Sequence, residues 1–416
     1  MAAIPISTIT TRPAAVASYL LSVIIPAYNE EDGIADILDR VLSIKPGLEA
    51  IGVAGPEVIV VDDGSKDRTV EIVKGYTNVR LIKHEKNRGY GGALKTGFAN
   101  AQGNLLAFLD ADGTYPPENF PDLCKAIQNG ADLVIGSRMA GAKSEMPKTR
   151  RLGNFIFANL VSIVGNQHVT DSASGMRVFR KETLERMYPL PDGLNFTPVM
   201  STRAIHENLK MVEVPIPYSE RLGRSKLSVV HDGMRFFNSI VWTALSYNPV
   251  RILGLLGLLG VGFATLVAAA LVLMRAGGTT QLGSWGIFAL FSAMVLGVGG
   301  VSLFSLGAMF NYLVALFQKK PVKQGLFGKP IFDPPLDRHF WWIGLLAVAV
   351  GFAVAAASVI LSLSGWTTER LWFWMVASAM VTLVGVQLIV AWIIMRVLDE
   401  LSKREILQAA DMQGER

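Results

Sequence analysis

Two aspartates separated by one residue are the feature of this sequence whose chemistry is easiest to interpret. Asp110 and Asp112 lie in "LLAFLDADGTYPP", where an apolar run typical of a buried strand gives way to a turn. Two carboxylates at the end of a strand can share a hard divalent cation such as Mg²⁺ or Mn²⁺, whose other positions are filled by water and phosphate oxygens. Solvated aspartate pairs are also common at strand ends, so the pair alone leaves both interpretations open.

Strands and helices alternate around this pair. Short β-rich runs are expected at residues 21–26, 57–62, 79–84, 105–110 and 131–136. Because helix-length polar stretches separate most of them, the order predicts an α/β domain with a mostly parallel sheet covered on both faces. Ligands of such sheets bind beyond the carboxyl ends of the strands. Those ends read "PAYNEE", "DDGSKD" and "DADG", so acidic and small polar residues are expected to converge at one edge.

A glycine-rich segment, "NRGYGGALKTG" at residues 87–97, follows the third expected strand and should begin a helix. Its backbone N–H groups could approach a phosphate or a sugar. Close packing of the helix against its neighbours would explain the glycines equally well. The segment is not a dinucleotide fingerprint, which needs a third glycine where Leu94 stands, and it is not a P-loop.

The composition divides the chain into two regions. Its 416 residues are 51% hydrophobic, yet the first half is rich in charged side chains. From Ile252 onward, apolar runs of about 20 residues recur, which is the length needed to cross a bilayer. Membrane-spanning helices are therefore expected at about 252–274, 285–317, 340–363 and 371–397.

Basic residues predict the orientation of these spans. Lys319, Lys320, Lys323, Lys329 and Arg338 follow the second span, whereas the two opposite loops carry only Arg275 and Arg370. Because cytoplasmic loops are enriched in Lys and Arg, the first domain and both termini are expected in the cytoplasm. A cleaved signal peptide is not expected, since cleavage would remove the start of the first strand.

Residues 1–228 should thus form a cytosolic domain, 251–398 a membrane domain and 399–416 a cytosolic tail. Residues 229–250 form an amphipathic segment between them. Val230, Met234, Phe237, Val241 and Ala244 recur on one helical face there. Such a helix can lie in the headgroup layer, or it can be an ordinary packed helix of the first domain.

Several other functions have little support. A net charge of +5, without a basic run interleaved with aromatics, argues against nucleic acid. The 5 histidines are scattered and indicate no zinc site, and no G-x-S-x-G elbow is present. The single cysteine, Cys124, excludes an intrachain disulfide, and its helical context predicts a core thiol.

Taken together, the motifs resemble a known family. "SVIIPAYNEE", "VIVVDDGSKDRT", "NRGYGGALKTGF", "LLAFLDADGTYPP" and "DLVIGSR" resemble, in that order, the GT-A domain of family 2 glycosyltransferases. The later "DSASGMRVFRKETL" and "VEVPIPYSERLGRSKLS" and the membrane tail resemble its polyprenyl-phosphate branch, which includes dolichol-phosphate mannose synthase and bacterial undecaprenyl-phosphate sugar transferases. The resemblance implies a Rossmann-like GT-A fold, a UDP- or GDP-linked sugar as donor, a polyprenyl phosphate as acceptor and Mg²⁺ or Mn²⁺ as cofactor.

The resemblance also implies roles for individual residues. Asp110 and Asp112 would hold the metal at the diphosphate, and Asp171 would position the acceptor or an arginine rather than remove a proton. The nucleotide pocket would be lined by Pro26, Tyr28, Glu30, Asp62, Asp63 and Ala111. Relatives often read D-A-D-L-Q, whereas here Gly113 and Thr114 follow, so the third protein ligand of the metal stays open.

A lipid phosphate is already an anion near neutral pH, so it needs cationic positioning more than a strong base. Candidates for this role precede the membrane helices: Arg138, Arg150, Arg151, Arg177, Arg221, Ser225 and Lys226. Gly223 would let the "RLGRSKLS" segment move as a gate over the site.

The sequence therefore predicts an inverting transferase that moves one sugar from a nucleotide sugar to undecaprenyl or dolichyl phosphate at the cytoplasmic membrane face. A processive polysaccharide synthase or a lipid-head-group glycosyltransferase is the alternative, and the lack of a Q-x-x-R-W motif argues against the processive enzyme. A non-catalytic assembly factor that senses a nucleotide sugar is an alternative of another class, and the two retained carboxylates favour catalysis over it. The sugar, the base and homo-oligomer formation stay open.

Overall fold

The computed structural model describes residues 19–141, 144–219, 229–279, 281, 283–318, 322, 325–326 and 332–413. The chain divides into two compact units, Met1–Ile240 and Val241–Arg416. We call them the N-terminal unit and the helical unit.

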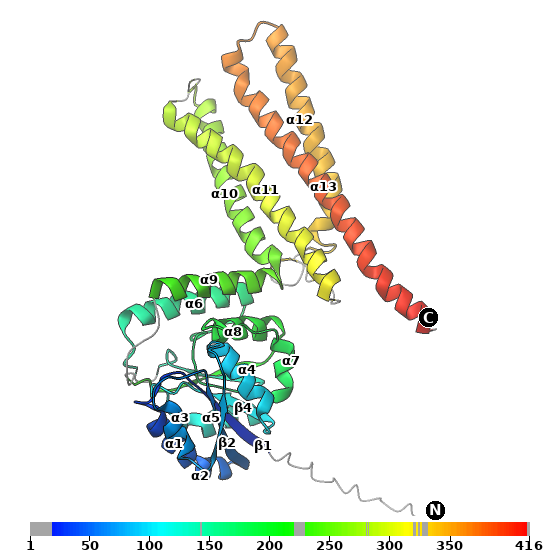
Figure 1. The fold of residues 1–416 in the computed structure, drawn as a ribbon. Coiled ribbons are helices and arrows are strands. Elements are labelled where there is room, and N and C mark those ends of the chain that lie inside the picture. Colours follow the sequence, from blue (N-terminus) through cyan, green and yellow to red (C-terminus); the bar gives the residue numbers. More distant parts are fainter. Residues whose placement is uncertain are drawn as a thin grey trace, which may run out of the picture. The chain divides into compact units, whose positions relative to one another are not determined.

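A sheet forms the centre of the N-terminal unit (Figure 1). It has seven strands in the order β3-β2-β1-β4-β6-β5-β7. The strands are β1 (Tyr19–Ala27), β2 (Val53–Asp62), β3 (Val79–Lys83), β4 (Leu105–Phe108), β5 (Leu133–Ser137), β6 (Arg177–Arg180) and β7 (Met211–Pro215). Only β6 runs antiparallel to its neighbours, β4 and β5. The predicted mostly parallel sheet is confirmed. The strands β6 and β7 were not predicted: β6 has arginine at each end, and β7 contains a glutamate and ends in proline.

Helices cover both faces of this sheet. One core packs α1 (Ile34–Ser43), α3 (Thr69–Lys74) and α5 (Phe120–Gln128) against the strands. The other packs α4 (Tyr90–Asn100), α6 (Lys148–Gly165), α7 (Leu184–Met187) and α8 (Phe196–His206). The short helix α2 (Lys45–Glu49) precedes β2.

Alternation along the strands supplies both cores. In β1, Val23 and Ile25 face the first core and Ile24 faces the second, because successive side chains of a strand point to opposite faces. Cys124 lies in the first core, where burial raises the pKa of its thiol to about 12.

Three residues separate helix α9 (Val229–Leu245) from the first apolar helix of the helical unit, which begins at Pro249. Its buried side chains include Asp232, Phe236 and Ile240, four residues apart, and Ile240 joins the second core. Met234 and Phe237, from the apolar face that the sequence predicted, are exposed. The helix therefore has two apolar sides, of which one is packed in the N-terminal unit.

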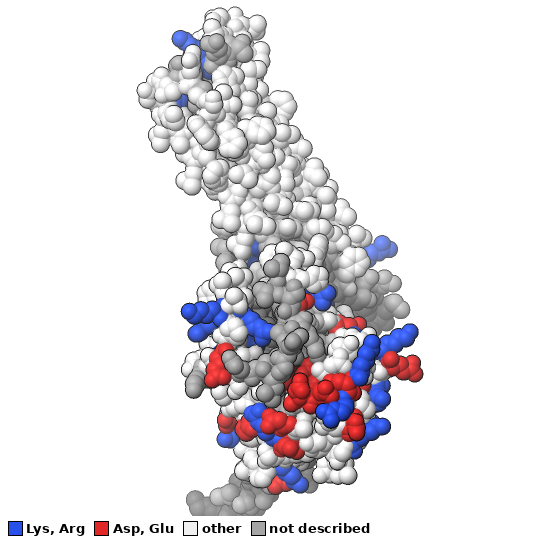
Figure 2. All heavy atoms as spheres, turned by 60° about the vertical axis from the view of Figure 1, so that its left-hand side comes forward, with Lys and Arg blue, Asp and Glu red and all other residues white. Residues whose placement is uncertain are grey.

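The helical unit contains α10 (Pro249–Ala276), α11 (Ser284–Gln318), α12 (Phe340–Leu363) and α13 (Thr368–Gln413). All four are long and apolar enough to cross a membrane. They coincide with the four predicted spans, except that α13 continues as a helix through most of the predicted tail. In Figure 2 the charged side chains gather over the N-terminal unit, while the visible sides of the long helices are almost free of charge.

Glycines allow these long helices to approach closely. A Cβ atom on Gly257 of α10 would lie 2.4 Å from the carbonyl oxygen of Gly300 on α11, and one on Gly300 would lie 2.5 Å from that of Gly257. Small residues at contacts between membrane helices permit such an approach. The contact between α10 and α11 therefore depends on these two positions.

We expect Gly300→Leu to destabilise the helical unit by about 1–3 kcal/mol, because the added side chain forces the two backbones apart. All 8 tryptophans lie in this unit, so unfolding followed by tryptophan fluorescence in detergent reports on it. Gly299→Leu is the matched control, since a Cβ atom there has no neighbour within 4 Å. Equal unfolding midpoints for the two variants would contradict the assignment of this contact.

Candidate functional site

The loops that follow β1 and β2 are joined by hydrogen bonds at the carboxyl edge of the sheet. The backbone N–H of Asn29 donates to Ser65 Oγ over 2.9 Å, and that of Lys66 donates to Asn29 Oδ1 over 2.8 Å. The N–H of Glu30 donates to Thr69 Oγ1 over 2.9 Å. These contacts hold one side of the edge where ligands of such a sheet bind.

A cavity of about 360 Å³ opens at this edge, and we call it the strand-end cavity. Its lining includes five of the six residues predicted for the nucleotide pocket: Pro26, Tyr28, Glu30, Asp63 and Ala111. The sixth, Asp62, does not line this cavity. It is buried, and its Oδ1 accepts a hydrogen bond from the N–H of Ser65 over 3.2 Å.

Asp63 is held by three hydrogen bonds. His84 Nδ1 lies 2.7 Å from Asp63 Oδ1, and the N–H groups of Arg88 and Gly89 donate to the two carboxylate oxygens over 2.8 Å. The other ring nitrogen, His84 Nε2, lies 2.9 Å from Thr96 Oγ1. This contact of His84 could not be predicted from the sequence, because His84 lies 21 residues from Asp63 and belongs to no motif.

The glycine-rich segment packs closely against the loop that follows α7. A Cβ atom on Gly91 would lie 2.1 Å from the carbonyl oxygen of Pro191, and one on Gly89 would lie 2.6 Å from that of Asp192. The N–H of Gly89 is bound to Asp63. Of the two interpretations of this segment, these contacts favour close packing.

The carboxylates of Asp110 and Asp112 follow β4, which ends at Phe108. The Tyr90 hydroxyl donates to Asp110 Oδ1 over 2.8 Å, and the Thr114 hydroxyl donates to Asp112 Oδ1 over 2.6 Å. A Cβ atom on Gly175 would lie 2.6 Å from Asp110 Oδ2. Each carboxylate is thus oriented by a neutral hydroxyl, and Asp110 occupies space that exists because residue 175 is glycine.

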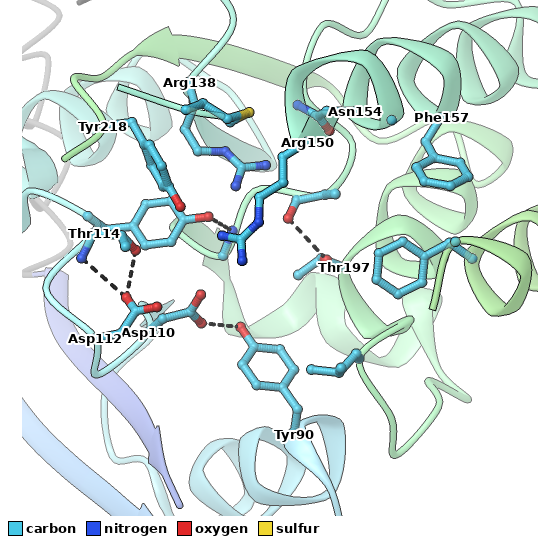
Figure 3. Close-up of a pocket in the computed structure, with 18 of the residues that line it drawn as sticks. Tyr90, Asp110, Asp112, Thr114, Arg138, Arg150, Asn154, Phe157, Thr197 and Tyr218 are labelled. Atoms are coloured by element: carbon cyan, nitrogen blue, oxygen red, sulfur yellow. Dashed lines mark hydrogen bonds between the residues drawn. The ribbon is translucent and has the colours of Figure 1, made fainter. Parts of the chain in front are cut away.

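A second cavity of about 250 Å³ also borders this pair, and we call it the arginine cavity. It shares Tyr90, Asp110, Asp112 and Leu194 with the strand-end cavity. Figure 3 shows Arg138 and Arg150 directed toward its interior, opposite Tyr90 and the two aspartates. An aromatic contact between Phe157 of α6 and Phe236 of α9, with ring centroids 5.7 Å apart, forms an apolar part of its wall.

Arg138 is fixed by a bidentate ion pair with Asp171. Its Nε and one terminal nitrogen each donate to a carboxylate oxygen of Asp171 over 2.7 Å. The guanidinium carbon also lies 5.7 Å from the ring centroid of Tyr115 and 5.5 Å from that of Tyr218. Arg138 can therefore present a positive charge in one fixed place.

The Asp171 side chain is completely buried, so it cannot reach a ligand directly. Burial alone would favour its neutral form, but the Arg138 guanidinium and a hydrogen bond from Asn154 hold the pKa of Asp171 below its usual value. Burial opposes the charge of Arg138 as well, and the Asp171 carboxylate nevertheless raises its pKa. Both groups are charged at neutral pH, and Asp171 acts through Arg138.

The other predicted phosphate ligands lie in different surroundings. Arg150 lines the arginine cavity, whereas Arg151 is exposed and lines neither cavity, because neighbours in a helix point about 100° apart. Arg177 is completely buried and donates to the carbonyl oxygens of Ser172 and Ser174. Burial lowers the pKa of Arg177 to about 10. An acceptor cannot reach Arg177 in this arrangement. Arg221, Ser225 and Lys226 lie outside the described residues.

The carboxylate pair fits a divalent cation that completes its shell elsewhere. Among the described residues there is no cluster of three or more His, Cys, Asp or Glu side chains. Mg²⁺ is commonly held by one or two carboxylates together with water and substrate phosphates. Asp110 and Asp112 border both cavities, so a cation bound to them could also be reached by a diphosphate in the strand-end cavity.

Comparisons with known proteins agree with this fold. Residues 22–188 match the model of glycosyl transferase family 2, and residues 249–409 match a domain of unknown function, DUF8752. The low-salt glycan biosynthesis hexosyltransferase Agl6 of Haloferax volcanii is 32% identical over 292 residues, which cover 69% of this chain and 67% of Agl6. The chain belongs to glycosyl transferase family 2, as the motifs predicted.

Two further similarities concern the N-terminal unit. The dolichyl-phosphate hexose transferase of Haloferax volcanii is 33% identical over 225 residues, which cover 54% of this chain and 94% of that protein. The crystal structure of glucosyl-3-phosphoglycerate synthase from Mycobacterium tuberculosis aligns with a TM-score of 0.46 at 20% identity, covering 55% of this chain and 81% of that one.

We expect Asp171→Asn to destabilise the N-terminal unit by about 3–5 kcal/mol at pH 7, because it leaves the Arg138 charge buried without a partner. Hydrogen exchange of backbone amides in β1 and β4 measures the free energy of unfolding of the N-terminal unit. The pKa of Asp171 is lower in the folded protein than in the unfolded chain, so its carboxylate stabilises the fold at pH values above the unfolded-state pKa. This stabilisation is lost as the pH falls through the folded-state pKa. The difference between variant and wild type should therefore shrink on acidification below about pH 4.

Asp36→Asn is the control for this experiment, since Asp36 forms an exposed ion pair with Arg40 one helical turn away. Such pairs contribute less than about 1 kcal/mol. A loss for Asp171→Asn as small as the loss for Asp36→Asn would show that the buried pair does not stabilise the unit.

Proposed function

We propose that this protein transfers one sugar from a nucleotide sugar to a polyprenyl phosphate, with inversion at the anomeric carbon and with a divalent metal. The observation that carries the proposal is the wall formed by Asp110 and Asp112, which borders two cavities of different chemistry. One cavity is lined by the polar loops at the strand ends. The other combines fixed arginines with aromatic and aliphatic side chains.

The strand-end cavity would hold the nucleotide diphosphate. Tyr28, Glu30 and Asp63 line it, and they would contact the base and ribose. When bound at Asp110 and Asp112, Mg²⁺ or Mn²⁺ would supply positive charge to the departing diphosphate. The choice between UDP and GDP is left to experiment.

The arginine cavity would hold the acceptor. Arg138 and Arg150 present charge to a phosphate, and guanidinium groups suit phosphate oxygens because their N–H donors form a planar fork. Met146, Phe157 and Phe236 give the same cavity an apolar wall suited to the first carbons of an isoprenoid. The dolichyl-phosphate hexose transferase of Haloferax volcanii supports this class of acceptor.

The state of Asp171 favours direct displacement. Its charge is paired with Arg138 and it is completely buried, so it would neither take a proton from the acceptor nor form a covalent intermediate. A phosphate monoester is already anionic near neutral pH and can attack the anomeric carbon without a base. One such displacement inverts the configuration at that carbon.

A membrane location would bring the acceptor to this cavity. Helix α6 exposes Leu152, Phe155, Ile156 and Ile163, and α9 exposes Met234 and Phe237. Exposed apolar residues on these helices suit the headgroup layer, where a lipid phosphate lies. The excess of basic residues in the loop after α11 supports a cytoplasmic catalytic unit with both termini on the same side.

The direct test incubates the purified full chain in detergent with undecaprenyl phosphate, Mn²⁺ and a panel of UDP- and GDP-sugars. We expect one nucleotide sugar to yield a singly glycosylated lipid phosphate, which mass spectrometry identifies. NMR should show that the anomeric configuration of the product is inverted relative to the nucleotide sugar. A chelator and the double variant Asp110→Asn/Asp112→Asn should each lower the rate more than about 100-fold, because the leaving group loses several kcal/mol of charge stabilisation.

Arg151→Gln serves as the matched control for Arg150→Gln, since the two arginines are adjacent and only Arg150 lines the cavity. Arg150→Gln should raise KM for the lipid phosphate, whereas Arg151→Gln should leave it near the wild-type value. Full activity of the double aspartate variant in chelator, or product with retained configuration, would contradict the proposal.

A further inference from the structure

We propose that Tyr90 is a positioning residue for the metal site, which orients Asp110 toward the divalent cation through its hydroxyl. The inference rests on the metal-dependent transfer proposed above and adds a residue to it. It starts from a contact between two segments of the sequence, the glycine-rich segment and the turn after β4.

Tyr90 and Asp110 form a direct hydrogen bond, and neighbouring residues pack against the Tyr90 side chain. The Tyr90 hydroxyl donates to Asp110 Oδ1 over 2.8 Å, and both residues line both cavities. The ring of Tyr90 meets that of Phe196 edge to face, with centroids 6.5 Å apart, and Phe196 is completely buried. Close packing of Gly91 against Pro191 holds the start of α4, to which Tyr90 belongs. The hydroxyl is therefore delivered from a fixed position.

Gly175 limits Asp110 from the other side. A single methyl group at residue 175 would lie 2.6 Å from Asp110 Oδ2, and the N–H of Gly175 is fixed by a 2.7 Å hydrogen bond to the Tyr115 hydroxyl. The carboxylate of Asp110 thus lies between a hydroxyl and a backbone segment. Its rotation about the Cβ–Cγ bond is restricted before any cation binds.

Orientation matters here because the candidate site has few protein ligands. Within the described parts of the chain, Asp110 and Asp112 are not joined by a third acidic, His or Cys side chain in one cluster. A tyrosine hydroxyl orients a carboxylate without adding positive charge, which would repel the cation. Removing a residue that orients a metal ligand commonly weakens metal binding by roughly 10–100-fold.

The experiment measures Mn²⁺ binding to the full chain in detergent, from the electron paramagnetic resonance signal of free Mn²⁺. We expect Tyr90→Phe to raise the Kd for Mn²⁺ about 10-fold or more while the thermal unfolding midpoint stays near the wild-type value. Tyr76→Phe is the control, since the Tyr76 hydroxyl donates to the Ala35 carbonyl and Tyr76 lines neither cavity. It should leave the Kd unchanged.

Kinetics separate positioning from a general loss of structure. For Tyr90→Phe, the Mn²⁺ concentration that gives half-maximal transfer should rise by the same factor as the Kd, and saturating Mn²⁺ should restore most of kcat. Gly175→Ala, which keeps Tyr90 but displaces the Asp110 carboxylate, should also weaken Mn²⁺ binding.

A wild-type Kd for Mn²⁺ in Tyr90→Phe would overturn the inference, and transfer by the wild type would then leave the proposed function intact. Conversely, if the wild type transfers no sugar to polyprenyl phosphate but Tyr90→Phe binds Mn²⁺ more weakly, the proposed function fails and the role of Tyr90 at the cation site stands.

Discussion

Two carboxylates one residue apart repel each other, and a divalent cation between them converts that repulsion into a binding site. Asp110 and Asp112 follow β4 in the N-terminal unit, where we propose that they bind such a cation. The Tyr90 and Thr114 hydroxyls orient one carboxylate each, and the glycine at position 175 makes room for Asp110. The two cavities that these aspartates border follow from the same arrangement.

A separate set of contacts fixes the positive charge of the Arg138 guanidinium. Arg138 forms a bidentate ion pair with the buried Asp171, and its guanidinium carbon lies 5.7 Å from the ring centroid of Tyr115 and 5.5 Å from that of Tyr218. Because the Asp171 carboxylate is ion-paired with Arg138, it is not available as a base. An acceptor that needs a base would therefore be a poor substrate. A lipid phosphate does not need one, so the buried pair and the proposed acceptor are consistent with each other.

The sequence was sufficient for features that depend on local patterns. The polar strand ends and the apolar spans are contiguous stretches whose composition predicts their place in the fold. The Asp110 and Asp112 pair is contiguous too, and the neighbouring motifs favoured a metal site over a solvated pair. The strand-end cavity accordingly contains most of the predicted nucleotide ligands. The short antiparallel strand β6 was missed because "RVFR" lacks a strand pattern, although it pairs with β4 beside the site.

Features that depend on contacts between distant segments were not predictable in this way. The contact of Tyr90 with Asp110 spans 20 residues, and the contact of Gly175 with Asp110 joins the segment before β6 to the segment after β4. The difference between Arg150 and Arg151 depends on the rotation of α6, which the polar start of that helix does not specify. Arg177 looked like a phosphate ligand because arginine is mostly exposed, whereas here backbone carbonyls satisfy part of its guanidinium in the interior.

The most direct test of this account is anomalous X-ray diffraction at the manganese edge from crystals of the full chain grown with Mn²⁺ and a nucleoside diphosphate. The account predicts an anomalous peak about 2.1 Å from a carboxylate oxygen of Asp110 or Asp112, with the diphosphate completing the shell from the strand-end cavity. A diphosphate bound in that cavity without a manganese peak at the aspartate pair would contradict it.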